Sequence, residues 1–299
     1  IGCTEIGGVV KAQSSADGLA AREMAVLTHL TRDAALPPVL LWAFGGGERE
    51  GLHFLSLPQL STNLGESIAS DAFVSDGMVW CFVADMVHAV LYLEGAGVVH
   101  FDLKPHNMLC SHSVYTVHST LVIADFGISR FVDGNTGFAS GMRGTPTYTA
   151  PEAEPGANCD SRTDAWSLAS TIHELWYGDT ACLDRNIDWV AHRGGRAASL
   201  RWRPPTLPGG SNQPSALHVQ SLIRPLFQPV SSRPSLSQLV ASLDADHPSS
   251  LWYSMVLAGH GVLAMMPASP PDAMPSDART SNASTGTPVA LSIGSPLPE

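Results

Sequence analysis

Charged residues are scarce in this sequence, and positively charged residues most of all. Charged residues make up 14% of the 299 residues, and the formal net charge is -11. A protein that binds nucleic acid usually gathers Lys and Arg into a basic patch. No such patch is visible along the chain, so we expect no nucleic-acid partner. The acidic balance mildly favours basic protein surfaces as partners, because net charge influences association.

Cysteine is also infrequent, and its distribution argues against a disulfide framework or a zinc site. The five cysteines are scattered, and none stands in a CxxC pair. This usage predicts a reduced setting, which we interpret as intracellular and cytoplasmic. The chain begins with Ile1 and shows no signal peptide before its first predicted strand. We therefore interpret it as a domain cut from a longer protein.

Long hydrophobic runs are absent, apart from one stretch at residues 251–266. A membrane span normally needs about 20 apolar residues. This stretch is shorter and contains Gly259, His260 and Gly261, so we predict a packed extension and no membrane partner. Beyond it, the Pro/Ser/Ala/Gly-rich composition predicts a disordered tail.

Lysine is rarer still, since the sequence contains two lysines, Lys11 and Lys104, and 14 arginines. Arg and Lys are not interchangeable where a phosphate is bound, because the ammonium is a compact point charge. Two lysines retained in so Arg-biased a sequence indicate two positions that require an ammonium.

The second lysine lies in the most informative stretch, residues 99–107 (VHFDLKPHN). Here Asp102 offers a proton acceptor, Lys104 an anion-binding ammonium and Asn107 an oxygen for a hard metal ion. Three such groups in six residues predict a site that moves a charged group. The run resembles the catalytic loop of protein kinases, H-R-D-L-x-x-x-N, with Phe101 where that family usually has Arg.

Further kinase-like motifs follow in the family order. The apolar run 121–124 predicts a buried strand that ends in Asp125-Phe126-Gly127, the D-F-G motif. A polar, Gly-rich stretch at residues 128–143 is typical of a mobile activation loop. It leads into residues 144–152 (GTPTYTAPE), which resemble the G-T-P-x-Y-x-A-P-E run of serine/threonine kinases.

The resemblance also assigns partners to these motifs. In the family the residue matched by Thr145 bridges the catalytic Asp and Lys. Residues 164–168 (DAWSL) resemble the start of a central helix whose Asp164 accepts hydrogen bonds from the catalytic-loop backbone. Arg233 matches the arginine that pairs with the glutamate of A-P-E, here Glu152.

The first twelve residues allow two interpretations. One is a glycine-rich phosphate loop, because Gly2, Thr4, Gly7 and Val9 follow G-x-G-x-x-G-x-V spacing. The other is a hairpin that turns at Gly7-Gly8 and places Lys11 in the next strand. We favour the hairpin, because Lys11 is the only lysine available before Lys104 for the strand position that a kinase requires. The true phosphate loop would then lie upstream of Ile1.

The pattern that follows predicts the remaining elements. Residues 18–30 have helical spacing, and Glu23 is the predicted partner of Lys11. Strands are predicted at residues 39–44 and 52–57, joined by a Gly-rich turn (GGGERE), with a hinge at 58–60. Helices are predicted at residues 78–94, capped by Ser75 or Asp76, and at 216–227 and 235–243.

The resemblance implies an α+β, bilobal fold. A β-rich and incomplete N-lobe would occupy residues 1–60, a mainly α-helical C-lobe residues 61–245, and an extension with a tail residues 246–299. The implied activity is transfer of the γ-phosphoryl group of ATP, with Mg²⁺, to Ser/Thr hydroxyls of protein substrates. An alternative function, that of a small-molecule kinase of related fold, is disfavoured by the A-P-E and D-x-W-S-L elements.

The resemblance further implies a role for each matched residue. In ATP binding, Lys11 would contact the phosphates and be steadied by Glu23. The Pro58 carbonyl and the Leu60 N–H would contact adenine, and Leu109 would lie beneath the ring. The Mg²⁺ ligands would be Asn107 and Asp125. The catalytic residues would be Asp102, Lys104, Asn107 and Thr145, with Asp102 accepting the hydroxyl proton and Lys104 neutralising the γ-phosphoryl group.

Phe101 raises a question about regulation. In many kinases the Arg at this position reads a phosphorylated activation loop. Its replacement predicts activity that does not depend on phosphorylation at Thr136 or Ser140. Together with the missing phosphate loop, it also suggests an alternative, a catalytically weak pseudokinase that serves as a scaffold.

Overall fold

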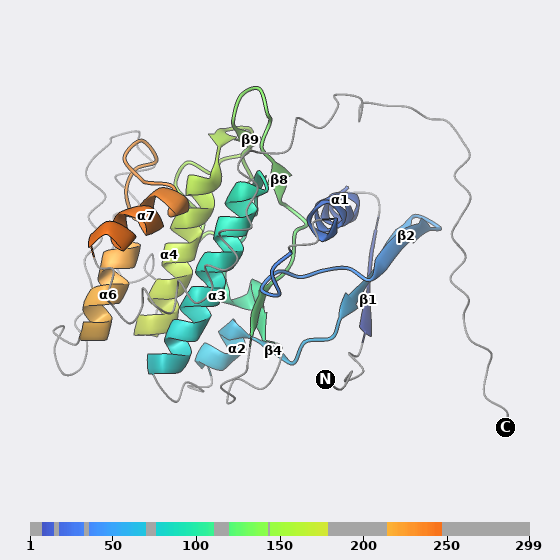
Figure 1. The fold of residues 1–299 in the computed structure, drawn as a ribbon. Helices are drawn as coiled ribbons and strands as arrows, with labels where there is room; N and C mark the ends of the chain where they lie inside the picture. The colour runs from blue at the N-terminus through green and yellow to red at the C-terminus, as the bar shows by residue number, and fades with distance from the viewer. Residues whose placement is uncertain are drawn as a thin grey trace.

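The computed structural model describes residues 8–14, 18–32, 36–69, 76–110, 120–142, 144–178 and 214–246. Within them the chain forms two lobes of an α+β fold, as predicted (Figure 1). The predictions for residues 1–7, for the apolar stretch 251–266 and for the tail lie outside the described residues. Within the described ranges, no helix combines the length and the hydrophobicity needed to cross a membrane.

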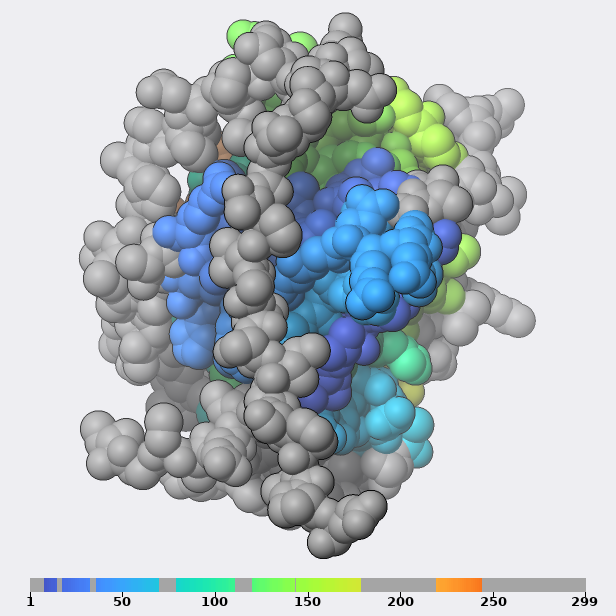
Figure 2. All heavy atoms as spheres, turned by 90° about the vertical axis from the view of Figure 1, so that its right-hand side faces the viewer, coloured from blue at the N-terminus to red at the C-terminus, as the bar shows by residue number. Residues whose placement is uncertain are grey.

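The small lobe is built on an antiparallel sheet with the strand order β1–β3–β2. Its strands are β1 (Gly8–Ser14), β2 (Gly45–Arg49) and β3 (Leu52–Pro58). Register places Lys11 of β1 opposite Leu55 of β3. Figure 2 turns this side of the molecule toward the viewer, with the blue residues of the small lobe at the surface.

Helix α1 (Leu19–Thr31) packs against this sheet and confirms the helix predicted at residues 18–30. It starts after Gly18 without a side-chain cap. Its stability therefore depends on tertiary packing, as is usual for a helix of this length. Val26, Leu27 and Leu30 are buried on the inner side, and the carboxylate-bearing Glu23 is buried with them.

The predicted strand at residues 39–44 is wrong, and the Gly-rich residues predicted as a turn are themselves strand β2. They fit there because glycine allows close approach: a Cβ on Gly46 would lie 2.8 Å from the Phe54 oxygen. The turn is Glu50-Gly51, both with positive φ, which suits a tight hairpin. Residues 39–41 instead join β7 (Leu121–Ile123), where Leu41 N–H donates to the Ile123 oxygen at 2.9 Å.

The large lobe is mainly helical. Within the described residues its helices are α2 (Leu64–Ala69), α3 (Asp76–Gly95), α4 (Ser161–Tyr177), α6 (Pro214–Ile223) and α7 (Leu236–Asp246). Helices α3 and α4 lie side by side, α6 packs against α4, and α7 contacts both α3 and α4 (Figure 1). The helices predicted at residues 78–94 and 235–243 are therefore present, and the helix predicted at 216–227 is present but ends at Ile223.

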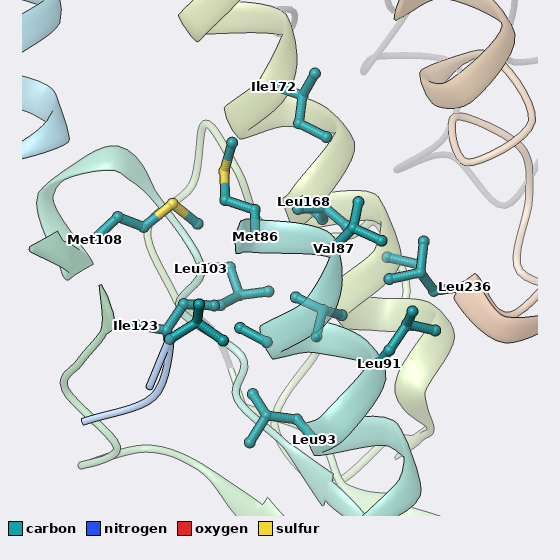
Figure 3. Packing of buried hydrophobic residues seen from close by; sticks show 14 of the residues in the cluster. Met86, Val87, Leu91, Leu93, Leu103, Met108, Ile123, Leu168, Ile172 and Leu236 are labelled. Atoms are coloured by element: carbon teal, nitrogen blue, oxygen red, sulfur yellow. The ribbon is translucent and has the colours of Figure 1, made fainter. Parts of the chain in front are cut away.

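The core of the large lobe surrounds α3, which is apolar on most of its sides because other elements cover it. Figure 3 shows side chains of α3 beside those of α4 and α7, with Met108 and Ile123 on the other side of the cluster. The labelled members of this cluster are Met86, Val87, Leu91, Leu93, Leu103, Met108, Ile123, Leu168, Ile172 and Leu236. This packing gives the loops above it a rigid support.

Short strands follow the small lobe along the chain. β4 (Thr62–Asn63), β6 (Met108–Cys110) and β7 form one sheet in the order β4–β6–β7. β5 (Val98–Val99) pairs with β8 (Arg130–Phe131), and β9 (Ala139–Ser140) pairs with β10 (Asn158–Cys159). A 3-10 turn at Pro105–Asn107 joins the catalytic loop to β6.

Candidate active site

The catalytic loop is anchored from below by Asp164, in the first turn of α4. Its carboxylate accepts the N–H of His100 at 2.6 Å and the N–H of Phe101 at 2.9 Å, which confirms the predicted contact. Full burial raises the pKa of Asp164 to about 7, although these two donors oppose the shift. Asp160, which was not predicted from the sequence to be a cap, caps α4 by accepting the Arg162 N–H. The loop is thus fixed to the central helix of the large lobe.

Phe101 fills the position at which the resemblance expected an arginine. Its side chain is buried, with 1% of its surface exposed. Its φ of 69° lies in the left-handed region, which is uncommon for a residue with a bulky side chain. The two hydrogen bonds to Asp164 hold this conformation, and the apolar side chain joins the core.

The carboxylate of Asp102 is held at both of its oxygens. Oδ1 accepts the Thr145 N–H at 2.9 Å and the Thr145 hydroxyl at 2.8 Å. Oδ2 accepts from the Lys104 ammonium at 2.7 Å and from the Asn107 amide at 3.0 Å. Burial alone would raise the pKa of Asp102, but the bonds from Lys104 and Thr145 outweigh it and keep the pKa below its usual value.

Lys104 and Asn107 complete this cluster. The Lys104 ammonium also donates to the Thr145 hydroxyl at 2.7 Å, so one threonine contacts both charged groups. The Asn107 amide nitrogen donates a second bond to the Asp102 carbonyl at 2.8 Å. The motif resemblance assigned Asn107 to catalysis and to the metal. It did not predict this contact with Asp102, because a spacing of five residues in a loop carries no signal for it.

His100 connects the catalytic loop to the D-F-G segment. Its Nε2 lies 3.1 Å from the Ala124 oxygen, and its Nδ1 accepts the Asp102 N–H at 3.3 Å. Its ring also contacts the edge of Phe126, with centroids 4.9 Å apart. Burial lowers the pKa of His100, so the ring is neutral at pH 7 and serves as a structural link.

Lys11 brings the small lobe into the site. Its ammonium lies 2.8 Å from Glu23 and 3.4 Å from Asp125. The predicted pairing of Lys11 with Glu23 is therefore present, across the interface of β1 and α1. Burial alone would lower the pKa of Lys11, but the two carboxylates outweigh it and raise the pKa above its usual value.

Asp125 and Asn107 are the residues that fit a divalent cation. Asp125 has a positive φ of 67°, and half of its side chain is exposed beside Lys11. The Asn107 amide nitrogen faces Asp102, which turns the amide oxygen the other way. A carboxylate and an amide oxygen suit Mg²⁺, which usually takes one or two protein oxygens besides waters and phosphates. Among the described residues no group of three or more His, Cys, Asp or Glu suits a metal by itself.

The residues assigned to adenine lie where the two lobes join. β3 ends at Pro58, and the Ser61 N–H donates to the Cys110 oxygen at 3.0 Å, so the link runs beside β6. Leu60 and Leu109 are half-buried against the core. The contacts of Pro58, Leu60 and Leu109 with a nucleotide remain predictions.

The end of the activation segment is tied to the large lobe by Glu152 and Arg233. The Arg233 guanidinium donates to both carboxylate oxygens of Glu152, at 2.5 and 3.1 Å. It is fully buried and also donates to the carbonyls of Arg162 and Gln228, and it lies 4.9 Å from the centre of the Trp166 ring. The predicted pairing is confirmed, and it is surrounded by more bonds than the sequence indicated.

The family of the chain follows from this geometry and from its similarity to known proteins. The family model described as the protein kinase domain matches residues 52–243. The chain belongs to the protein kinase family, whose members generally use ATP and Mg²⁺.

Its curated relatives are protein kinases from several organisms. Over 104 residues the chain is 38% identical to "Myosin light chain kinase A" of Dictyostelium discoideum, covering 33% of this chain and 34% of the relative. It is 34% identical over 124 residues to "Calcium/calmodulin-dependent protein kinase kinase" of Caenorhabditis elegans, covering 40% and 22%. It is 28% identical over 159 residues to "Serine/threonine-protein kinase RUNKEL" of Arabidopsis thaliana, covering 52% and 11%. The similarity thus spans about a third or less of each relative.

Proposed function

We propose that this chain is an ATP-dependent serine/threonine protein kinase. The observation that carries the proposal is the arrangement around Asp102, whose two oxygens receive four hydrogen bonds from Lys104, Asn107 and Thr145. Such a fixed carboxylate suits a base that must meet one hydroxyl in one orientation. It lies in the same site as the Lys11–Glu23 pair and Asp125, which suit the phosphates of a nucleotide.

Nucleotide binding is assigned to the small lobe and to the D-F-G segment. Lys11 holds the α- and β-phosphates, and Glu23 keeps its ammonium in place. The Pro58 carbonyl and the Leu60 N–H bind adenine, and Leu109 lies beneath the ring. Asp125 and Asn107 would hold Mg²⁺, which would neutralise charge on the phosphates.

Phosphoryl transfer is assigned to the catalytic loop. Asp102 accepts a hydrogen bond from the substrate hydroxyl and takes its proton as the hydroxyl oxygen bonds to the γ-phosphorus. The bond between that phosphorus and the bridging oxygen of ATP breaks, and ADP leaves. Lys104 stabilises negative charge on the transferred group, and the Thr145 bridge fixes Lys104 relative to Asp102. The lysine at position 104 and the GTPTYTAPE run favour Ser/Thr acceptors in protein substrates over tyrosine.

The test measures transfer of labelled γ-phosphate from ATP·Mg²⁺ to peptide mixtures that carry Ser, Thr or Tyr acceptors. The wild-type chain is expected to label Ser/Thr peptides. Asp102→Asn should retain ATP binding but lower kcat by roughly 10²–10⁴-fold, because it removes the base. Lys11→Met should weaken ATP binding. Glu50→Gln, at an exposed carboxylate in the β2–β3 turn, is the control and should leave both quantities unchanged.

Three outcomes separate the alternatives. Binding of ATP by the wild-type chain without transfer would support the pseudokinase. Full transfer by Asp102→Asn would refute the assignment of the base. Labelling of sugar or amine alcohols in preference to peptides would indicate a small-molecule kinase.

A further inference from the structure

Gly144 lies where the activation segment crosses the catalytic loop, and the space there excludes any side chain. An ideal Cβ on Gly144 would stand 2.2 Å from the Phe101 oxygen, 3.0 Å from Asp102 Oδ1 and 3.2 Å from the Phe101 carbonyl carbon. Real Cβ atoms essentially never approach another heavy atom within 3.0 Å. Even alanine would therefore force the two segments apart by about 1 Å.

The requirement for glycine is steric and not conformational. Gly137 and Gly156 have positive φ angles, which favour glycine for their backbone alone, but Gly144 is not among the glycines with positive φ. An alanine at position 144 would thus avoid positive-φ strain and fail through its contacts with Phe101 and Asp102. This separates the effect of the side chain from backbone strain.

The side of the contact formed by Phe101 cannot easily move. Phe101 N–H and His100 N–H are both held by the buried carboxylate of Asp164. The His100 oxygen accepts the Ser129 hydroxyl at 3.3 Å, and the Phe101 side chain is buried in the core. The displacement caused by a larger residue would therefore fall on the activation segment, at positions 144 and 145.

Thr145 is the residue that such a displacement would affect. Its N–H and hydroxyl both donate to Asp102 Oδ1, and its hydroxyl accepts from Lys104. These distances lie between 2.7 and 2.9 Å, so a shift of about 1 Å would break all three bonds.

We propose that Gly144 is a positioning residue for Asp102. Its missing side chain lets the activation segment approach until Thr145 holds the aspartate. The activation segment thereby supports the base directly, although Gly144 touches no reacting atom. The catalytic meaning of this role rests on the proposed function, whereas the contact itself does not.

The kinetic test compares Gly144→Ala with a matched control, Gly47→Ala. A Cβ on Gly47, in the exposed strand β2, would meet nothing within 4 Å. Gly144→Ala is expected to lower kcat by roughly 10–100-fold, because a misplacement of about 1 Å costs rates of this order. KM for ATP should stay within about twofold, since the bonds of Lys11 do not involve this segment. Gly47→Ala should match the wild type.

A double-mutant cycle with Thr145→Ala distinguishes positioning from general damage. If Gly144 acts through Thr145, Gly144→Ala should reduce kcat by less than about twofold in the Thr145→Ala background. Full multiplicative losses would overturn the proposal. Should Gly144→Ala fail to fold, Thr145→Ala needs no additional space, and a wild-type kcat in that variant would overturn the proposal as well.

Hydrogen exchange tests the contact without any phosphoryl transfer. The Thr145 amide should be protected in the wild-type chain and in Gly47→Ala, and at least tenfold less protected in Gly144→Ala. Unchanged protection would overturn the proposal. A wild-type chain that transfers no phosphate would refute the proposed function instead, and the exchange result alone would then decide whether Gly144 positions Asp102.

Discussion

At the scale of single residues, the site depends on how a few charged groups compensate for one another's burial. The Lys11–Glu23 pair and the Asp102–Lys104 pair place each carboxylate against an ammonium. Removing one member of a buried pair usually costs more than the pair contributes, because it leaves an uncompensated charge. Asp85 differs, because among the described residues its carboxylate accepts a hydrogen bond from a backbone N–H, that of Leu121, and not from an ammonium.

Asp85, on α3, should make stability depend on pH. Burial raises its pKa from an ordinary value near 3.8 to about 6, while the Leu121 N–H at 2.9 Å opposes the shift. The folded state then binds more protons than the unfolded state between about pH 4 and pH 6. The contribution of Asp85 to the free energy of unfolding therefore falls as the pH rises through this window, and it stays low above it.

Asp85→Asn tests this because it keeps an oxygen for the Leu121 N–H and removes the charge. The free energy of unfolding of the variant should rise relative to that of the wild type as the pH increases from 4 to 8. The rise should be roughly 1–3 kcal/mol, since one pKa unit corresponds to about 1.4 kcal/mol. Urea unfolding at pH 4, 6 and 8 measures the difference. A gap between the two proteins that is constant with pH would contradict the assigned shift.

At the scale of secondary-structure elements, the helix ends show which helices are stabilised by local capping residues and which depend on tertiary contacts. Helix α1 has no side-chain cap, whereas α4 is capped by Asp160 and ends at Gly178 in the left-handed conformation. Helix α7 starts with a reciprocal pair: the Gln238 N–H donates to the Ser235 hydroxyl at 3.2 Å, and the Ser235 N–H donates to the Gln238 oxygen at 3.0 Å. This is the capping-box arrangement, with Gln in the third helical position.

Ser235→Ala should destabilise the large lobe by about 1 kcal/mol, because it removes the cap and leaves a helical N–H without its acceptor. The control is Ser242→Ala on the same helix, whose hydroxyl donates to the Leu239 carbonyl and caps nothing. Thermal or urea unfolding should show a loss for Ser235→Ala only. Equal effects of the two substitutions would mean that the cap contributes no stability.

At the scale of the whole molecule, backbone hydrogen bonds hold the activation segment to the large lobe. The Val132 N–H donates to the Gly97 oxygen at 2.8 Å, and the Gly141 N–H donates to the Ala157 oxygen at 2.7 Å. The β5–β8 and β9–β10 pairs add to these contacts. Arg130 donates to the carbonyls of Ile128 and Ser129, and the Phe101 position provides no guanidinium. None of these contacts needs a phosphate group.

Phosphorylation of Thr136 or Ser140 should therefore change kcat/KM by less than tenfold, about 1.4 kcal/mol of barrier. At Thr136 a phosphate would stand beside Asp133, whose carboxylate already accepts the Asn135 and Thr136 N–H groups at 2.9 Å. The measurement compares phosphatase-treated chain with chain phosphorylated at these sites, and Thr136→Ala and Ser140→Ala serve as controls. An increase in kcat/KM of more than tenfold on phosphorylation would contradict this prediction.

The sequence by itself indicated the proposed chemistry and determined the order of the motifs. Lys11, Glu23, Asp102, Lys104, Asp125 and Thr145 are identified by motifs, because phosphoryl transfer restricts which residue types suit each position. The helices were predictable where apolar residues recur at helical spacing, as in α1 and α3. The β2–β3 hairpin was not predictable, because Gly45–Gly47 are typical of a turn. The register against Phe54 and Leu55 shows that they form a strand.

Only the tertiary structure decided how these residues support one another. The Asn107 bonds to Asp102, the burial of Phe101 and the close approach of Gly144 all join segments through space. Spacing along the chain carries no signal for such contacts, since they depend on which backbones meet and how closely. The sequence marks Gly144 as the first residue of the GTPTYTAPE run but does not show why that residue is glycine. At position 144 the packing of the activation segment against the catalytic loop leaves room for no other residue.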